Sequence, residues 1–239
     1  MLRDALNDLF GARLLDEHPG EWGIADHCPD PSAIGYATTI TPRSISAALD
    51  LGADVIVTHH DAWSFMYEQR ERVYELLRES CLTHVWAHLP LDQADFGTSA
   101  TLLTEAGCAE VWKPTEGEVR IGRLEGSTDF EGIRSVFDSL LREQPRSLHD
   151  SGRAIRRIGC VTGAGVYTGY LKDAMAHDID LYLTGETSLY LCEYAVHHGI
   201  SVLVYSHNHT ELPGVRAFAE RLGQALQLEV KGHLGDSHF

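Results

Sequence analysis

Short apolar runs alternate with longer amphipathic segments along the whole chain. Apolar runs of four to eight residues bounded by turn signals are typical of buried strands, and apolar positions three or four apart are typical of helices. The predicted strands cover residues 33–40, 54–58, 84–89, 119–126, 155–163, 180–186 and 200–206. The predicted helices cover residues 3–16, 44–51, 67–80, 97–107, 129–142, 167–177, 188–198 and 211–226. This alternation predicts an α/β protein with mostly parallel strands.

A turn-rich stretch, WKPTEGE at 112–118, is the best candidate boundary between two halves. It suggests an N-terminal α/β lobe over 1–113 and a C-terminal α/β lobe over 114–239.

A short internal repeat crosses this division. Three segments each contain a helix end, a turn, an apolar strand and a polar tip, which carries His60, Glu186 or His207. Any helix-to-strand unit would look similar, but ligands of open α/β sheets do bind at the carboxyl ends of the strands.

Composition narrows the classes of protein. The chain has 239 residues, a formal charge of −16 and 44% hydrophobic residues, which is a globular composition. The acidic excess argues against a nucleic-acid binder or an anionic-membrane binder, since both need basic patches. Five cysteines without a CxxC pair argue against a disulfide scaffold or zinc ribbon. No signal-peptide pattern and no apolar run of 18 residues occur, so we expect a cytoplasmic protein.

Fourteen histidines stand out, because neutral imidazole is a good metal ligand. His59 and His60 directly follow a buried strand. Adjacent side chains on a strand point to opposite faces, but at a strand tip both rings can face one cavity. The alternative is a pair of loop histidines with no ligand role.

Carboxylates and further histidines follow other strands. Asp92 lies in HLPLD, just past a strand, and could be a ligand or a helix cap. His88 could be a ligand, a partner that orients a ligand, or a core residue.

A third group is SHNHTELPG at 206–214. Pro213 should fit only the first turn of a helix, so we expect the helix to begin near Thr210 as N-cap. On that interpretation His207 and Glu211 are not a helical i, i+4 pair, although a tight loop can bring them together. His209 is an alternative ligand, and Glu211 could instead be a first-turn acid favoured by the helix dipole.

Three histidines and two carboxylates at three strand tips exceed what one tetrahedral zinc needs. They suit two metal ions, with open positions for catalysis, although a mononuclear site stays an alternative. Their chemistry does not distinguish Zn, Fe, Mn, Ni and Co.

The chain resembles the NGG-interacting-factor-three-like dinuclear metal-centre family, whose members are described as GTP cyclohydrolase I type 2 homologues. The resemblance rests on GADVIVTHH, AHLPLD, DLYLTGE and SHNHTE, in the order and spacing of the family. It implies a two-lobed α/β fold with the metal site in the cleft between the lobes, and a homohexamer. It also implies that the metal ligands are His59, His60, Asp92, His207 and Glu211, with Glu211 bridging two ions.

Three places depart from the family pattern. Asp61 and Ala62 follow the double histidine, whereas many members of the family have Pro or Gly there. Asp61 could add negative charge near the site or could face solvent. His207 and His209 are alternative candidates for the family's histidine ligand. We favour His207 because its spacing from Glu211 along the sequence matches that of the family. The N-terminal loop is reduced to GEWGIAD, which puts substrate contacts from that loop in doubt.

Two further features are candidates for substrate binding. The glycine-rich turn at 163–169 could hold a phosphate on backbone N–H groups, or could simply be a tight turn. Arg153, Arg156 and Arg157 form a basic cluster beside it. Strand alternation would leave only part of that cluster on one face, so we favour a solvated edge over a binding site for it.

The leading hypothesis is a metal-dependent hydrolase acting on a nucleotide or a phosphorylated small molecule. Glu186 and His88 are the candidate proton-transfer groups, although Glu186 could equally orient a ligand or cap the next helix. The competing hypothesis is a non-enzymatic metal-binding or regulatory hexamer.

Overall fold

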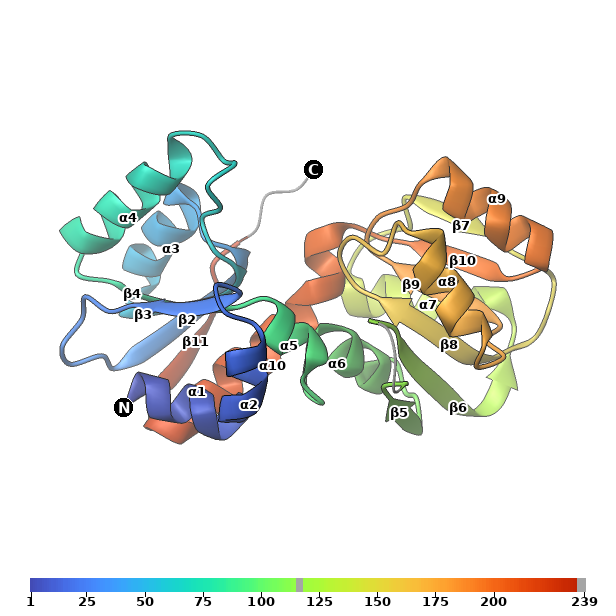
Figure 1. Cartoon of the computed structure of the whole chain (residues 1–239), viewed down its shortest axis with the longest axis horizontal. Helices are drawn as coiled ribbons and strands as arrows, with labels where there is room; N and C mark the ends of the chain where they lie inside the picture. Colours follow the sequence, from blue (N-terminus) through green and yellow to red (C-terminus); the bar gives the residue numbers. More distant parts are fainter. Residues whose placement is uncertain (115–117, 236–239) are drawn as a thin grey trace. The chain divides into compact units, whose positions relative to one another are not determined.

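The computed structural model describes residues 1–114 and 118–235, which form two compact α/β units (Figure 1). The first unit comprises Met1–Gly97 together with Gly214–Phe239, and the second comprises Thr98–Pro213. The chain therefore leaves the first unit once and returns to it. The expected boundary segment 112–118 includes residues 115–117, which lie outside the described residues.

This partition differs from the expected division at residue 113 because strand pairing crosses that position. Strand β5 (Glu110–Trp112) pairs with β6 (Arg120–Thr128) in the second unit. Near the C-terminus, β11 (Glu229–His233) pairs with β2 (Ala33–Thr39) in the first unit.

The first unit is a five-stranded sheet in the order β1-β4-β3-β2-β11, in which only the edge strand β1 is antiparallel to its neighbour. Helices α3 and α4 cover one face, and α1, α2 and the later part of α10 cover the other (Figure 1). Val55 and Val57 face one hydrophobic core while Ile56 faces the other, which explains the continuous apolar run. The remaining elements are α1 (Leu2–Phe10), α2 (Ala12–Glu17), β1 (Trp22–Ala25), α3 (Pro42–Leu51), β3 (Val55–His60), α4 (Gln69–Glu79), β4 (Thr83–Ala87) and α5 (Leu89–Gln93).

The second unit is a six-stranded sheet in the order β5-β6-β8-β9-β10-β7. The inner strands β8, β9 and β10 are parallel, and antiparallel strands flank them. Helices α6 and α7 pack on one face, and α8 and α9 pack on the other. The elements are α6 (Thr98–Glu105), α7 (Phe130–Leu141), β7 (Ser147–His149), β8 (Ile155–Val161), α8 (Thr168–Met175), β9 (Leu181–Thr184), α9 (Leu189–His198), β10 (Ser201–Val204) and α10 (His207–Leu226).

The structure confirms the predicted α/β class with mostly parallel strands and adds detail at the sheet edges. The short strands β1, β5, β7 and β11 were not predicted, because three to five residues carry too little periodicity. The predicted helix 3–16 is two helices that meet at Gly11, whose φ of 79° ends the first of them.

Helix α10 begins at His207 rather than near Thr210, so the expected N-cap was wrong. Pro213 lies inside the helix. Proline removes one helical hydrogen bond, but the following residues Val215, Phe218 and Leu222 are fully buried in the core of the first unit. Tertiary packing therefore outweighs the local preference of proline.

Among the described residues, no helix combines the length and the apolar character needed to cross a bilayer.

Candidate metal centre

His59 and His60 end strand β3, and their rings lie together, with centroids 4.7 Å apart. His59 is 1% exposed, and its Nδ1 lies 2.9 Å from the carbonyl oxygen of Ala87 on the neighbouring strand. Since a carbonyl only accepts, Nδ1 carries the proton and Nε2 presents a lone pair. The Nδ1 of His60 lies 2.9 Å from the hydroxyl of Thr39, its partner in the β2–β3 register. The tip of this strand therefore fixes both rings.

His88 joins this pair from the end of strand β4. Ring nitrogens of His59, His60 and His88 lie within 4.8 Å of one another, which is close enough to share a metal ion. The Nδ1 of His88 donates to the carboxylate of Glu21 at 2.6 Å. Glu21 immediately precedes β1, the strand that pairs with β4, so the sheet brings this acid to the histidine. An imidazole held by a carboxylate on one nitrogen is the usual arrangement of a metal ligand.

Asp92 lies in the short helix α5, with one carboxylate oxygen 3.4 Å from Nε2 of His59. It is not the cap of a later helix, because α5 already includes it. The structure thus groups His59, His60, Asp92 and His88 in the first unit.

His207 and Glu211 occupy the first turns of α10 and form an i, i+4 pair, with Nε2 and Oε1 3.0 Å apart. This corrects the expectation that their spacing is not helical, which followed from placing the helix start too late. Glu211 is 4% exposed. The Nδ1 of His207 donates to Glu186 at 2.6 Å. Because β9 and β10 are parallel neighbours, Glu186 and His207 follow adjacent strand ends.

The two acids change the protonation of His207. Burial alone would lower the pKa of His207, but hydrogen bonds and charge from Glu211 and Glu186 outweigh it and raise that pKa to about 9. In the absence of an ion, a proton thus holds the imidazole between two carboxylates. A divalent cation would replace that proton, so binding would release it.

Gly163 supports this group from the end of β8. Its φ is +62°, and a Cβ there would lie 2.2 Å from Oε1 of Glu211 and 3.0 Å from Nε2 of His207. Its N–H donates to the hydroxyl of Thr210, which in turn donates to the carbonyl of His207. The glycine-rich turn therefore packs directly against the ligand candidates, which favours the tight-turn interpretation.

The structure also distinguishes the alternatives that the sequence left open for His209 and Asp61. His209 pairs with Glu143 at 3.3 Å, and His207 with Glu186 and Glu211, so the second unit groups His207 rather than His209 with Glu211. Asp61 is buried and accepts a hydrogen bond from Tyr74, so it does not face solvent. Burial raises the pKa of Asp61.

Glu186 does not cap the next helix. Ser188 is the N-cap of α9, and its side chain accepts from Leu191 N–H. Glu186 is therefore available to orient His207.

Sequence reasoning missed Glu21 and Thr39, which position candidate ligands, and it considered the turn that contains Gly163 only as a phosphate site or a tight turn. Their roles depend on strand pairing and close packing, which no local motif reveals. For Thr39, the sequence offers only its place at the end of the predicted strand 33–40, which does not single it out.

The donor set fits a transition-metal ion. Imidazole nitrogens and carboxylate oxygens suit Zn, Fe(II), Mn, Ni or Co. Four histidines have Nδ1 engaged by a carbonyl, a hydroxyl or a carboxylate, which leaves Nε2 as the candidate ligand atom: His59, His60, His88 and His207.

Comparison with curated proteins finds similar chains of similar length. A protein of Pseudomonas aeruginosa named GTP cyclohydrolase 1 type 2 homolog is 32% identical, covering 96% of this chain and 93% of its own. A protein of Escherichia coli K12 with the same name is 26% identical, covering 91% and 94%.

Solved structures share the fold. A protein of Thermus thermophilus, TTHA1606, superposes with a TM-score of 0.83 at 23% identity, covering 100% of this chain and 99% of its own. The structure titled "protein ybgI, unknown function" gives a TM-score of 0.82 at 22% identity, covering 99% and 98%.

A family model described as Duf34/NIF3 (NGG1p interacting factor 3) matches residues 23–234. That match spans most of the chain, including every candidate ligand described above. The chain therefore belongs to the Duf34/NIF3 family.

Proposed function

We propose that this protein is a dinuclear metal-dependent hydrolase whose ligands are His59, His60, Asp92, His207 and Glu211. One observation carries the proposal: buried or half-buried histidines are held at Nδ1, and their Nε2 atoms converge with carboxylates. Orienting partners of this kind are typical of metal-binding histidines.

Two divalent ions would supply Lewis acidity and a water nucleophile of lowered pKa. The chain itself contributes orientation. Ala87 and Thr39 fix the rings of His59 and His60, and Glu186 fixes that of His207. Gly163 leaves room for the Glu211 carboxylate, which we propose as the bridging ligand.

Glu186 and His88 are the proposed proton-transfer groups. Glu186 is half exposed and bonds to His207, so it can exchange protons with solvent beside the ligand set. His88 can pass a proton to Glu21 through their hydrogen bond. A ring nitrogen of His88 also lies close to the candidate ligand atoms of His59 and His60. His88 is therefore an additional candidate ligand.

Nucleotides or phosphorylated small molecules are the proposed substrates. The name GTP cyclohydrolase 1 type 2 homolog, carried by relatives, makes GTP the first substrate to test. The residues that the structure describes show no feature specific to guanine, so the screen should include other nucleotides and phosphoesters.

The test combines metal content and turnover. Protein loaded separately with Fe(II), Mn, Zn or Ni should contain two ions per chain by elemental analysis and should hydrolyse at least one compound. His59→Ala and His207→Ala should each lower ion content and abolish turnover. His197→Ala, at an exposed histidine of α9, is the matched control.

The outcomes separate the alternatives. One ion per chain would replace the dinuclear centre with a mononuclear one. Two ions without turnover on any substrate would favour the non-enzymatic metal-binding or regulatory assembly. We also propose a homohexamer acting in the cytoplasm, and light scattering coupled to size-exclusion chromatography tests the assembly by its mass.

A further inference from the structure

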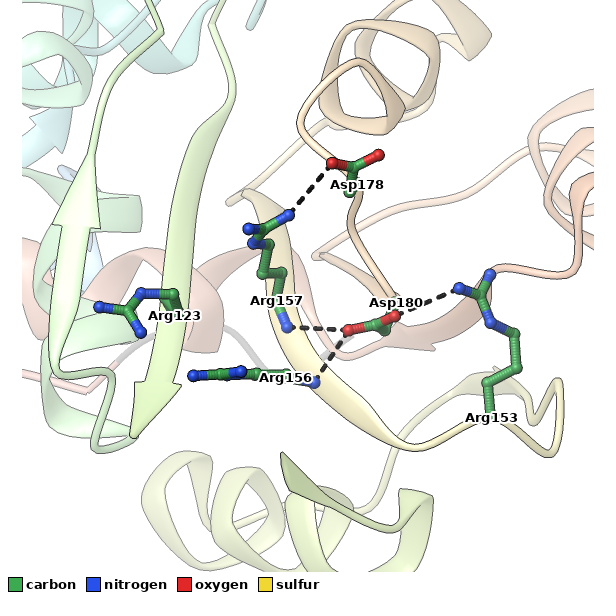
Figure 2. Close-up of a pocket in the computed structure, with 6 residues that line it drawn as sticks. All are labelled: Arg123, Arg153, Arg156, Arg157, Asp178 and Asp180. Atoms are coloured by element: carbon green, nitrogen blue, oxygen red, sulfur yellow. Dashed lines mark hydrogen bonds and ion pairs between the residues drawn. The ribbon is translucent and has the colours of Figure 1, made fainter. Parts of the chain in front are cut away.

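A basic cavity lies in the second unit, where strand β8 begins beside β6 (Figure 2). It measures about 390 Å³ and is lined by Arg123, Arg153, Arg156, Arg157, Asp178 and Asp180. The sequence suggested that strand alternation would split the arginine cluster between two faces. The structure instead gathers all three members around one hollow and adds a fourth arginine from the neighbouring strand.

Strand pairing explains this gathering. Arg123 on β6 is directly opposite Arg157 on the antiparallel strand β8. The register then shifts between Arg123 and Thr128, opposite Arg156. A register irregularity of this kind can re-aim a side chain that regular alternation would send to the other face.

Like charges placed directly across an antiparallel pair destabilise a sheet. Nearby acids offset part of that repulsion. Arg123 pairs with Glu110, Arg157 with Asp178 at 3.2 Å, and Arg153 with Asp180 at 3.5 Å. Four guanidinium groups therefore face three carboxylates.

Arg156 carries the excess positive charge. Its backbone N–H donates to Asp180, but its guanidinium has no ion pair within the described part of the chain. One Asp180 oxygen accepts the N–H groups of both Arg156 and Arg157, so this acid is engaged by the strand itself. The guanidinium of Arg156 keeps its donors for a ligand.

We propose that this cavity binds the phosphate group of a small phosphorylated molecule, with Arg156 as the principal ligand and Arg123, Arg153 and Arg157 beside it. Arginine presents planar pairs of N–H donors that match phosphate oxygens. The cavity is within the size range of small-molecule pockets and exceeds what inorganic phosphate alone would fill. A positive hollow on a chain of charge −16 also concentrates anions locally. This site is separate from the proposed metal ligands, and its success or failure does not depend on them.

The test uses the full-length protein as purified, with ¹⁵N-labelled arginine side chains followed by NMR. The probes are inorganic phosphate and AMP, with adenosine as the uncharged counterpart. We expect both anions to shift the Nε–H signal of Arg156 at low ionic strength, and adenosine to leave it unchanged. Added salt should weaken the binding. A tighter affinity for AMP than for phosphate would show that groups beyond the phosphate are recognised.

Three variants complete the design, with affinity measured by calorimetry. Arg156→Gln should weaken phosphate and AMP binding at least tenfold, and Arg43→Gln, which removes the same charge from an exposed arginine of α3, should not. Asp178→Asn removes an opposing charge at an exposed side chain and should tighten binding severalfold. A gain of affinity cannot result from misfolding. The proposal fails if wild-type protein does not bind either anion, if Arg156→Gln binds equally well, or if Asp178→Asn does not bind more tightly.

Discussion

Glu186 accepts a 2.6 Å hydrogen bond from Nδ1 of His207, which turns the opposite ring nitrogen toward Glu211. The two residues are 21 positions apart in the chain and meet because β9 and β10 are parallel neighbours. Glu186 therefore sets the tautomer and the orientation of a candidate ligand without being a ligand itself.

We predict that Glu186→Gln lowers metal affinity by about tenfold, in line with partners that orient metal-binding histidines. Glutamine can still accept from Nδ1, but it lacks the charge that favours proton donation from that nitrogen. Competition with a chromogenic chelator measures the change. Glu193→Gln, at an exposed acid of α9, should behave as wild type. Equal metal affinity in wild type, Glu186→Gln and Glu193→Gln would contradict a role for Glu186 in orienting His207.

Gly163→Ala should destabilise the protein and disrupt the site together. The backbone φ of +62° costs a non-glycine residue about 1–3 kcal/mol. The new methyl group would also collide with the Glu211 carboxylate. Chemical denaturation and elemental analysis measure the two effects.

Gly169→Ala is the matched control for this substitution. It lies in α8 with nothing within 4 Å of its added Cβ, so stability and ion content should be maintained or slightly improved. Full ion content in Gly163→Ala would contradict the inferred crowding around Glu211.

Asp54 should contribute stability that depends on pH. Hydrogen bonds from Ser32, from its hydroxyl and its backbone, lower the pKa of Asp54, with Ala33 N–H adding to the effect. The folded pKa is thus below the unfolded value of 3.8. The contribution is fully present above the unfolded pKa and is lost as pH falls through the folded one.

Asp54→Asn should therefore reduce the free energy of unfolding by about 1 kcal/mol at pH 7. The difference from wild type should be constant near pH 7 and should shrink as the pH is lowered below the unfolded pKa of 3.8. Urea unfolding across that range measures it, with Asp8→Asn at an exposed position of α1 as control. A difference that stayed constant over this range would mean that the Asp54 charge is not the cause.

Chelation should lower the melting temperature of metal-loaded protein. At an ion concentration 100 times the dissociation constant, binding adds about 2.7 kcal/mol to stability. For a chain of this size, removing it corresponds to about 5–10 °C. Scanning calorimetry with and without chelator measures the shift in melting temperature. The His59→Ala/His207→Ala double variant should show little shift when chelator is added. An unchanged transition after confirmed ion loss would argue against tight binding.

Much of the fold was predictable because its signals are local. The run DVIVT predicts a buried strand, and the structure buries it between two helical layers. His59 and His60 could be placed at a strand tip for the same reason, since an apolar run stops there. The start of α10 was missed because local proline chemistry competed with packing of Phe218 and its neighbours in a distant core.

The sequence alone determined the class of the fold, most of the longer strands and helices, and the polar residues that follow several of the strands. Those features depend on side chains within a few positions of one another. Only the tertiary structure decided that Glu21 holds His88, that Glu186 holds His207, and that Gly163 makes room for Glu211. These contacts depend on strand order, register and close packing, which are set by burial of the whole sheet and leave no short-range pattern in the chain.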